Sequence, residues 1–308
     1  MNIKIACPSN VVTGGVELLH QVAAELNKYD DVTAELWYLF DSENTAIPDE
    51  YLEYDNRINN FVAPGDILIF PEIWANLTNL EYFKDHQKIV YWCGVNAYFT
   101  HNAREGWFKF GEGTLHISQS EYSKHFLLDV LKVDENDIIE ITDYINDAFL
   151  KCDITVKRDP IVLYNPAKGM EFTEKLIALV DDISFIPIQG MTRAEIIALM
   201  KRSMVWIDFG DFPGKDRLPR EAGACGMVLI TSRKGTAKYQ KDLDIPVQFK
   251  LYDVNYADLD YIAQMIRDVQ KCFTYYQDLF RGYRNRLRFE KWQFETGIKE
   301  LLEVLYEV

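Results

Sequence analysis

The chain has 308 residues, of which 48% are hydrophobic and 26% are charged, and its formal net charge is -15. This length allows two domains of ~150 residues, and the hydrophobic content allows each a proper core, which excludes a disordered chain. Residues 1–154 hold 10 basic and 26 acidic side chains, whereas residues 155–308 hold 23 and 22. The acidic N-terminal half would repel duplex nucleic acid and anionic membrane surfaces, so we expect no nucleic-acid partner.

Targeting and metal-binding signals are absent from the sequence. No apolar run approaches the ~20 residues that span a bilayer, and the N-terminus lacks the pattern of a signal peptide. We therefore expect a cytoplasmic protein without a transmembrane segment, and recruitment to a membrane by other proteins stays open. The five cysteines are scattered, and the five histidines form no helical pair around a glutamate. These patterns predict reduced core thiols and no metal site.

The N-terminal half alternates strands and helices. It opens with a strand at 3–7, a glycine turn and a helix at 16–26. Further strands are expected at 33–40, 66–70, 88–93 and 115–118, with a helix at 122–131. This order predicts a parallel sheet with helices on both faces. Gly14 and Gly15 would let a backbone approach a sugar or phosphate closely. The full dinucleotide fingerprint is missing, which disfavours a dehydrogenase-type site.

A second cycle of the same kind begins near residue 159. A strand, the turn Asn-Pro-Ala-Lys-Gly and a helix are followed by a strand at 183–187. Thr192 and Glu195 have the spacing of a capping box at the start of a helix over 193–202. Buried strands at 203–210 and 228–231 complete the cycle. The chain is therefore predicted to be an α/β protein of two Rossmann-like units joined near residues 150–160.

The loop between the last two of these strands has the composition of an anion site. The run FPGKDRLPREAGACG places Lys215, Arg217 and Arg220 ahead of a predicted helix start rich in small residues. Backbone donors at a helix N-terminus together with guanidinium groups suit a phosphate or diphosphate. The alternative is that these cations are a solvated surface cluster.

The run LPREAGACGMVLIT resembles the LPxxEAxACGxPVIxS segment of the retaining glycosyltransferases of family four. The resemblance implies the GT-B architecture, in which two Rossmann-like domains face a cleft and a C-terminal helix crosses back to the N-terminal domain. Applied to this chain, it implies an acceptor domain over 1–154 and a nucleotide-sugar domain over 155–285. Residues 286–308 would form the terminal helix that packs back on the N-terminal domain.

The resemblance also implies roles for individual residues. Glu221 matches the glutamate that holds the ribose, although Pro213 replaces the family's first glutamate and only Asp211 or Asp216 is a nearby carboxylate. Lys168 matches the diphosphate lysine, but Leu163, Tyr164 or Asn165 stands where an arginine usually precedes it. We assign catalysis to Lys168, Arg217 and Asp216, and donor binding to Gly14, Gly15, Asn165, Gly190, Met191, Gly214, Lys215, Arg220 and Glu221. Gly190 and Met191 would meet the nucleobase.

Simpler explanations stay open for several of these residues. Lys168 and the cations of the loop can be solvated charges, and Gly190 with Met191 can be an ordinary turn. Glu221, if it lies in the first turn of a helix, can serve the helix dipole. Asn96 or His101 can contact the acceptor or be an ordinary loop residue. The same choice between stacking on an acceptor sugar and packing in the core applies to a set of aromatic residues: Trp74, Trp92, Tyr98, Phe99, Trp107 and Phe108.

The function that the resemblance implies is transfer of a sugar from a nucleotide-sugar donor to a glycan or lipid-linked acceptor with retention of configuration. The donor would be a UDP-, GDP-, ADP- or dTDP-linked sugar, with no obligatory cofactor or metal. The departing phosphate itself would take the acceptor proton. A nucleotide-sugar epimerase or hydrolase, and a non-catalytic GT-B module that binds a nucleotide or glycan, are the alternatives. The base, the sugar, the acceptor and the oligomeric state stay open.

Overall fold

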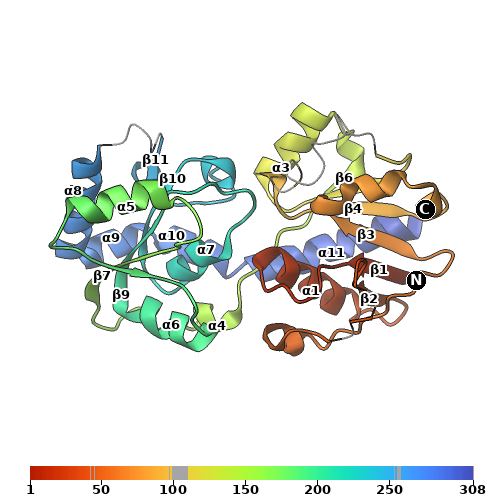
Figure 1. The fold of residues 1–308 in the computed structure, drawn as a ribbon, viewed down its shortest axis with the longest axis horizontal. Coiled ribbons are helices and arrows are strands. Elements are labelled where there is room, and N and C mark those ends of the chain that lie inside the picture. Colours follow the sequence, from red (N-terminus) through yellow and green to blue (C-terminus); the bar gives the residue numbers. More distant parts are fainter. Residues whose placement is uncertain are drawn as a thin grey trace. The chain divides into compact units, whose positions relative to one another are not determined.

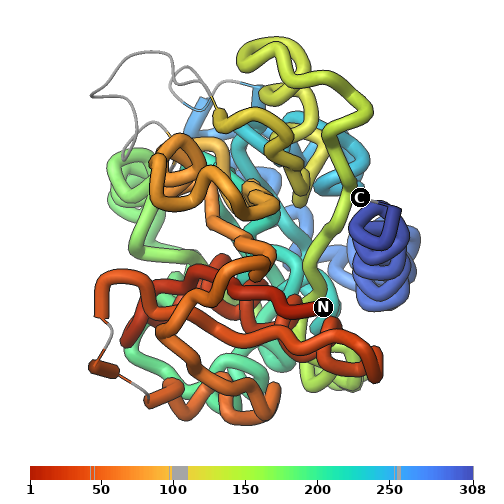
Figure 2. Tube along the Cα trace, turned by 90° about the vertical axis from the view of Figure 1, so that its right-hand side faces the viewer, coloured from red at the N-terminus to blue at the C-terminus, as the bar shows by residue number. Residues whose placement is uncertain are grey.

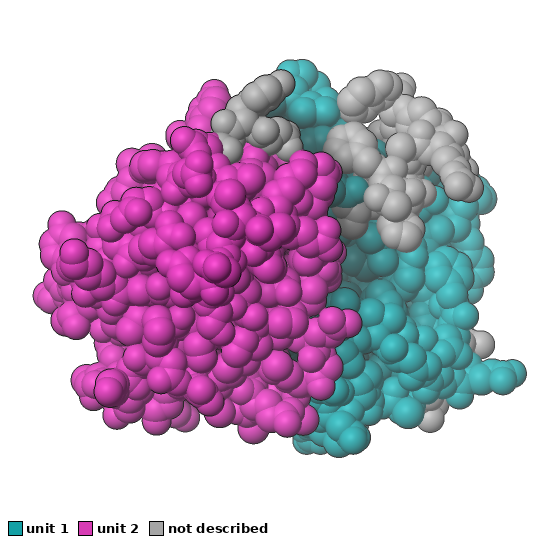
Figure 3. All heavy atoms as spheres, turned by 60° about the vertical axis from the view of Figure 1, so that its left-hand side comes forward, with its two compact units in different colours: residues 1–143, 213–215, 291–308 teal, residues 144–212, 216–290 magenta. Residues whose placement is uncertain are grey.

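The computed structural model describes residues 1–41, 43–44, 46–96, 98, 110–252, 254 and 258–307. The chain divides into two compact units, which Figure 3 shows in different colours. Unit 1 comprises residues 1–143, 213–215 and 291–308, and unit 2 comprises residues 144–212 and 216–290. Each unit contains one parallel sheet with helices on both faces (Figure 1).

Unit 1 is built on a six-stranded sheet of order β2-β1-β3-β4-β5-β6, in which neighbouring strands are parallel. Its strands are β1 (Asn2–Ala6), β2 (Thr33–Trp37), β3 (Ile67–Pro71), β4 (Lys88–Trp92), β5 (Leu115–Ser118) and β6 (Ile138–Glu140). Its helices are α1 (Gly14–Leu26), α3 (Glu121–His125) and most of α11 (Glu290–Glu307), with 3₁₀ helices at Asp49–Tyr54, Glu72–Asn79, Glu81–Phe83 and Glu135–Asp137.

Local sequence accounts for most of these elements. The first helix starts where Thr13 caps it by accepting a hydrogen bond from the Val16 backbone, and every residue of β4 is buried, as expected for a central parallel strand. The helix predicted over 122–131 is instead α3 followed by a π-helix at Phe126–Leu131. It ends at Lys132, whose φ of 58° lies in the left-handed region.

Unit 2 is built on a five-stranded sheet of order β11-β10-β9-β7-β8, again parallel. Its strands are β7 (Asp159–Tyr164), β8 (Ser184–Pro187), β9 (Ser203–Asp208), β10 (Val228–Ser232) and β11 (Lys250–Leu251). Its helices are α4 (Asp147–Leu150), α5 (Met170–Leu179), α6 (Arg193–Arg202), α7 (Arg217–Ala224), α8 (Leu259–Lys271), α9 (Phe273–Leu279) and α10 (Arg281–Leu287), with 3₁₀ helices at Gly235–Lys238 and Val247–Phe249. In Figure 1, α5 and α6 lie on opposite faces of this sheet.

The helix in the small-residue run differs from its prediction. The small residues were expected to start it, but α7 begins at Arg217 and ends at Ala224. Gly226 stops it, because its φ of 84° is one that glycine adopts readily. Glu221 therefore lies in the second turn, and its proposed service to the helix dipole in a first turn is wrong. The capping box of Thr192 and Glu195 on α6, by contrast, is confirmed.

The C-terminal helix packs within unit 1. Figure 2 shows α11, in blue, running beside the yellow-green segment that includes β6. A Cβ added to Gly297 would lie 2.8 Å from the Glu140 carbonyl oxygen, so α11 approaches this segment as closely as a glycine permits. Near its end, the Tyr306 hydroxyl donates to Asp31 at 2.6 Å.

The strand orders confirm the prediction of two Rossmann-like units and locate the edge where ligands are held in such folds. In unit 1 the chain reverses direction across the sheet between β1 and β3, and in unit 2 between β7 and β9. Open α/β sheets bind ligands beyond the carboxyl ends of their strands at such switch points. The residues that follow these four strands are therefore the first to consider as a site.

Candidate functional site

Lys168 and Asp208 lie on either side of the switch point of unit 2. The Lys168 ammonium lies 3.2 Å from Asp208 Oδ2, donates to the Asp211 carbonyl at 2.9 Å, and also pairs with the Asp216 carboxylate. It stands 4.0 Å above the centre of the Phe212 ring, a cation–π distance. The structure thus brings together two of the predicted catalytic residues, Lys168 and Asp216. Asp208 is an addition that the sequence analysis missed.

Burial shifts the pKa values of Lys168 and Asp208. Burial lowers the pKa of Lys168, but the charges of Asp208 and Asp216 outweigh it and the net shift is upward. Burial raises the pKa of Asp208 to about 6, against the lowering effect of Lys168. At neutral pH Lys168 is therefore a cation and Asp208 is mostly an anion. A phosphate that binds Lys168 has to compete with at least one of these carboxylates.

Two glycines let the loops after β7 and β9 meet. A Cβ on Gly169 would lie 2.5 Å from the Gly210 nitrogen, and one on Gly210 would lie 2.7 Å from Lys168 Cγ. Gly169 also has a φ of 66°, which favours glycine. Asp208 accepts a hydrogen bond from the Gly210 nitrogen at 3.1 Å, and Ser232 donates to the Gly210 carbonyl at 2.6 Å. These contacts fix the backbone around the lysine.

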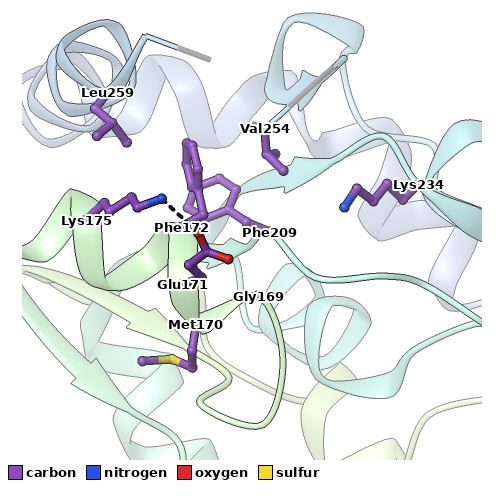
Figure 4. Close-up of a pocket in the computed structure, with 9 residues that line it drawn as sticks. All are labelled: Gly169, Met170, Glu171, Phe172, Lys175, Phe209, Lys234, Val254 and Leu259. Atoms are coloured by element: carbon purple, nitrogen blue, oxygen red, sulfur yellow. Dashed lines mark hydrogen bonds and ion pairs between the residues drawn. The ribbon is translucent and has the colours of Figure 1, made fainter. Parts of the chain in front are cut away.

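A pocket of about 500 Å³ adjoins this cluster within unit 2. Figure 4 shows Lys175 and Lys234 reaching into it from opposite sides, with the rings of Phe172 and Phe209 between them. Glu171 pairs with Lys175 at 2.9 Å. The full lining is Gly169, Met170, Glu171, Phe172, Lys175, Phe209, Lys234, Val254 and Leu259. The volume suits a small organic ligand, and the backbone N–H groups at the start of α5 add donors for an anion.

The pocket was not anticipated from the sequence, because its walls come from loops and helices that follow four different strands. None of the residues assigned to catalysis or donor binding is among those that line it in the described part of the chain. It adjoins the cluster through chain neighbours: Gly169 follows Lys168, which was assigned to catalysis, and Phe209 follows Asp208, which was not assigned. The acidic residue at the end of the apolar strand 203–208 was the one available signal in the sequence.

Helix α7 carries the remaining loop candidates of unit 2. Arg217 and Glu221 are both half-buried and are four residues apart, so they share a face of the helix. Arg220 differs from both in its burial: its guanidinium is almost fully buried and pairs with Glu290 at 2.8 Å. The observed contact of Arg220 is thus an internal ion pair, and its assignment to the donor stays a prediction.

The other assigned residues of unit 2 lie in turns. Asn165 accepts a hydrogen bond from the Ala167 nitrogen at 2.9 Å and so shapes the turn that leads to Lys168. Gly190, with a φ of 64°, and Met191 follow β8, the strand beside β7. Gly190 is exposed and Met191 is partly buried. Their assignment to the nucleobase stays a prediction.

The remaining candidates belong to unit 1. Gly14 and Gly15 form the first turn of α1, after β1. Gly214 and Lys215 cluster with this unit too: a Cβ on Gly214 would lie 2.0 Å from the Cys93 carbonyl oxygen, and the Lys215 ammonium donates to Thr142 at 2.5 Å. These four residues therefore belong to unit 1, whereas Lys168, Asp208 and Asp216 belong to unit 2.

Glu72, which the sequence analysis did not select, occupies the corresponding edge of unit 1. It follows β3 and is 4% exposed, and its carboxylate accepts from the Cys93 nitrogen at 2.9 Å. Burial raises its pKa to about 7, against the lowering effect of backbone donors that include Gly94. Gly15 is close by, since a Cβ there would lie 3.6 Å from Cys93 Cβ. Unit 1 thus holds a buried carboxyl that titrates near neutrality beside its switch point.

The aromatic candidates divide by burial. Trp92 is 0% exposed and Tyr98 is 4% exposed, both within one core cluster, so neither can stack on an acceptor. Trp74 is partly buried beside Phe40, with ring centres 5.3 Å apart. Asn96 accepts from the Tyr122 hydroxyl at 3.4 Å. Phe99, His101, Trp107 and Phe108 lie outside the described residues.

Two features bear on metals and membranes. Within the described ranges, no group of three or more histidine, cysteine, aspartate or glutamate side chains is arranged to hold a metal ion. No helix among the residues that the structure places is both long and apolar enough to cross a bilayer.

Comparison with known proteins defines the class of fold. No protein-family model and no curated protein matches the chain. Solved structures do match over their full length, and they include GT-B glycosyltransferases. The chain therefore has the two-Rossmann-like GT-B fold, as predicted.

Three solved structures illustrate this likeness. Sucrose-phosphate synthase from Thermosynechococcus elongatus is 13% identical, with 100% of this chain and 99% of that chain covered and a TM-score of 0.64. A glycosyltransferase from Rickettsia africae ESF-5 is 14% identical, with coverages of 99% and 98% and a TM-score of 0.60. UDP-GlcNAc 2-epimerase from Neisseria meningitidis, bound to UDP-GlcNAc, is 12% identical, with 100% of both chains covered and a TM-score of 0.55.

Proposed function

We propose that this protein is a glycosyltransferase that moves a sugar from a nucleotide-sugar donor to a glycan or lipid-linked acceptor, with retention of configuration, in the cytoplasm. The observation that carries the proposal is the Lys168 cluster at the switch point of unit 2, next to a pocket of about 500 Å³. A fixed cation, helix N-terminal donors and an open volume at one sheet edge match the needs of a nucleoside diphosphate linked to a sugar.

In this proposal the donor's diphosphate takes the place of Asp216 on Lys168. Lys168 and Arg217 then stabilise the negative charge that develops on the diphosphate as the glycosidic bond breaks. Asp216, displaced from the lysine, then contacts the donor. Glu221, on the same helical face as Arg217, accepts hydrogen bonds from the ribose hydroxyls. No metal is needed, because the cations and backbone donors supply the positive potential.

Unit 1 would take the acceptor in this scheme. The glycine turn at Gly14 and Gly15 gives close access to the backbone after β1, and Glu72 adds a carboxyl next to it. In this scheme the departing phosphate takes the proton of the acceptor hydroxyl, since retention places the phosphate and the acceptor on the same face of the sugar. The acidic N-terminal half favours a neutral or basic acceptor surface over an anionic one.

The test is turnover of a donor panel followed by NMR of the anomeric protons. UDP-, GDP-, ADP- and dTDP-linked sugars are incubated with the protein and candidate acceptors, with and without EDTA. We expect release of one nucleotide and a new anomeric signal of unchanged configuration, insensitive to EDTA and lost in Glu221→Ala. Glu300→Ala, an exposed carboxylate on α11, is the matched control and should retain activity. Equal activity in both variants would remove Glu221 from the donor site.

Epimerisation is the second candidate, because a nucleotide-sugar epimerase shares the fold over the full chain. The same NMR experiment separates the two activities. An epimerase changes the ring-proton couplings of the sugar without any acceptor, whereas a transferase makes a product only when the acceptor is present. Saturable nucleotide binding without any product would instead identify a non-catalytic module.

A further inference from the structure

Two cysteines far apart in sequence meet inside unit 2. Cys152 follows α4 and Cys225 follows α7, and their Sγ atoms lie 2.6 Å apart although 73 positions separate them in the chain. Cys225 is 0% exposed, whereas Cys152 is partly exposed, so an oxidant can reach the pair from the Cys152 side. Both are free thiols, as the sequence predicted, but their spacing in the sequence gave no sign that the fold brings them together.

The backbone on both sides of the pair is held in place. Arg158, which is 5% exposed, donates to the carbonyls of Cys225, Met200 and Ser203. Gln277 donates to the carbonyls of Ile154 at 3.3 Å and Gly226 at 2.9 Å, which joins the segment after Cys152 to the segment after Cys225. Two thiols held this way meet at a high effective concentration, so little chain entropy remains to be lost on bonding.

Close packing holds the segment after Cys152 against the segment after Cys225. A Cβ on Gly226 would lie 2.8 Å from Ile154 Cγ2 and 2.9 Å from Arg158 Nη2. The residue after Cys225 is thus in contact with residues just beyond Cys152. The thiols are consequently kept together by the fold and not by their own weak attraction.

The two sulfurs are chemically unequal. A hydrogen bond from Cys225 lowers the pKa of Cys152, burial opposes this shift, and the nearby charges of Arg158 and Lys201 support it. The same hydrogen bond together with burial raises the pKa of Cys225. Cys152 is therefore the sulfur that forms a thiolate, and the thiolate is the form that reacts with oxidants.

We propose that Cys152 and Cys225 are an oxidant-sensitive pair that forms a reversible disulfide when a peroxide reaches unit 2. The Cys152 thiolate attacks one peroxide oxygen, the O–O bond breaks, and a sulfenic acid and hydroxide form. The Cys225 sulfur then attacks the Cys152 sulfur and displaces hydroxide, while the Cys225 proton completes a water molecule. Overall, two thiols lose two electrons and one peroxide becomes two waters. The bond would tie α4 to the end of α7.

The experiment uses the full-length protein with Cys272→Ser, because Cys272 is exposed and can pair between molecules. The folded protein is treated with hydrogen peroxide, alkylated under denaturing conditions and analysed by intact-mass and tryptic peptide mass spectrometry. We expect a mass loss of ~2 Da before alkylation and a cross-linked species that joins peptides 152–157 and 221–233. Dithiothreitol should restore both thiols, and the oxidised protein should melt at a higher temperature.

Cys152→Ser and Cys225→Ser, each in the same background, are the matched variants, and both should abolish the cross-link. The cross-link is measured in protein with both thiols intact, so the result does not depend on whether either variant folds. Sulfinic acid at Cys152 without a cross-link, or a cross-link only after unfolding, would overturn the proposal. None of these readouts requires a glycosyl donor, so the outcome is independent of the proposed function.

Discussion

Lys168 Nζ and Asp208 Oδ2 lie 3.2 Å apart. Lys168 lies in the loop after β7, and Asp208 is the last residue of β9. The Asp208 side chain is fully buried, whereas that of Lys168 is 22% exposed, so the lysine covers the carboxylate and keeps one side toward solvent. This arrangement gives unit 2 a cation at its switch point that is positioned by a buried anion.

Removing this lysine should destabilise the fold in a pH-dependent way. In Lys168→Ala the buried Asp208 loses its cation, and we expect a loss of about 1–3 kcal/mol in the free energy of unfolding at pH 8. The folded-state pKa of Asp208 is already raised to about 6, so its stabilising contribution is present at low pH and is lost as the pH rises through that value. Without Lys168 this pKa rises further, and the loss extends to higher pH.

Urea unfolding at pH 5 and pH 8 measures this effect. The difference between wild type and Lys168→Ala should be larger at pH 8 than at pH 5. Lys299→Ala, an exposed lysine on α11, serves as the control and should stay within about 0.5 kcal/mol of wild type at both pH values. If the stability difference between wild type and Lys168→Ala were independent of pH, the loss would not come from the unpaired Asp208 carboxylate.

Two glycines with nearly the same backbone angle separate conformational strain from steric clash. Gly169 has a φ of 66° and no room for a Cβ, whereas Gly190 has a φ of 64° and nothing within 4 Å of its Cβ position. Gly190→Ala should therefore cost about 1 kcal/mol from the left-handed backbone alone. Gly169→Ala should cost at least about 1 kcal/mol more, because the loop at Gly210 has to move.

Chemical denaturation of the two glycine variants provides the comparison, and nucleotide binding by each folded variant adds a functional readout. Equal destabilisation would mean that the loop at Gly210 yields freely to a methyl group. Weaker nucleotide binding by Gly190→Ala, measured where that variant is fully folded, would support the assignment of Gly190 to the nucleobase.

Variants of Arg220 and Glu290 test whether Arg220, which was assigned to binding of the sugar donor, has a structural role instead. The paired atoms are 2.8 Å apart and both side chains are buried, so Glu290→Ala removes a carboxylate from a buried guanidinium and should cost about 3–5 kcal/mol. Arg220→Met with Glu290→Leu removes both charges and should recover most of that loss. The exposed pair of Arg281 and Asp278 offers the control, and Arg281→Ala should change stability by less than about 0.5 kcal/mol.

Thermal and urea unfolding report the stability of these variants, and titration with the donor nucleotide reports their binding. If the double variant binds the nucleotide as wild type does, Arg220 is a structural residue. Loss of binding in a stable double variant would support its place in the donor site.

Because of Glu72, the stability of unit 1 should decrease as the pH rises from mildly acidic to neutral. Its pKa is raised from an ordinary value of 4.5 to about 7, so its contribution is complete below pH 4.5 and disappears as the pH rises through 7. Glu72→Gln stays neutral and can still accept from Cys93. The free energy of unfolding of this variant, relative to that of wild type, should therefore increase by about 3 kcal/mol between pH 4.5 and 7.5.

Denaturation across this pH range, with carbon-detected NMR of the Glu72 carboxyl, measures the shift directly. Glu81→Gln, whose side chain is 84% exposed, is the matched control and should track wild type at every pH. A carboxyl that titrates near pH 4.5 would refute the prediction.

Local patterns were sufficient for most of the architecture. The strand at Leu115–Ser118 and the helix at Arg193–Arg202 occur with the predicted bounds, because periodic burial and a capping box depend on neighbouring residues. The two Rossmann-like units followed from the order of such elements, and the GT-B fold followed from the resemblance carried by the run LPREAGACGMVLIT. The start of α7 was misplaced because the small residues that end the helix next to Gly226 resemble a helix start in isolation.

The sequence by itself thus determined the elements, their order and the loops that carry charge. Only the tertiary structure decided which side chains meet: Lys168 with Asp216 across 48 positions, Arg220 with Glu290 across 70, and Cys152 with Cys225 across 73. Periodicity and capping act over a few residues, whereas these contacts form only when the whole unit packs. Lys168 and Asp216 follow two neighbouring parallel strands, and the other two pairs join α7 and the residue after it to the start of α11 and to the segment after α4. The pocket beside Lys168 belongs to the same class, because its walls exist only after β7, β9, β10 and β11 have paired.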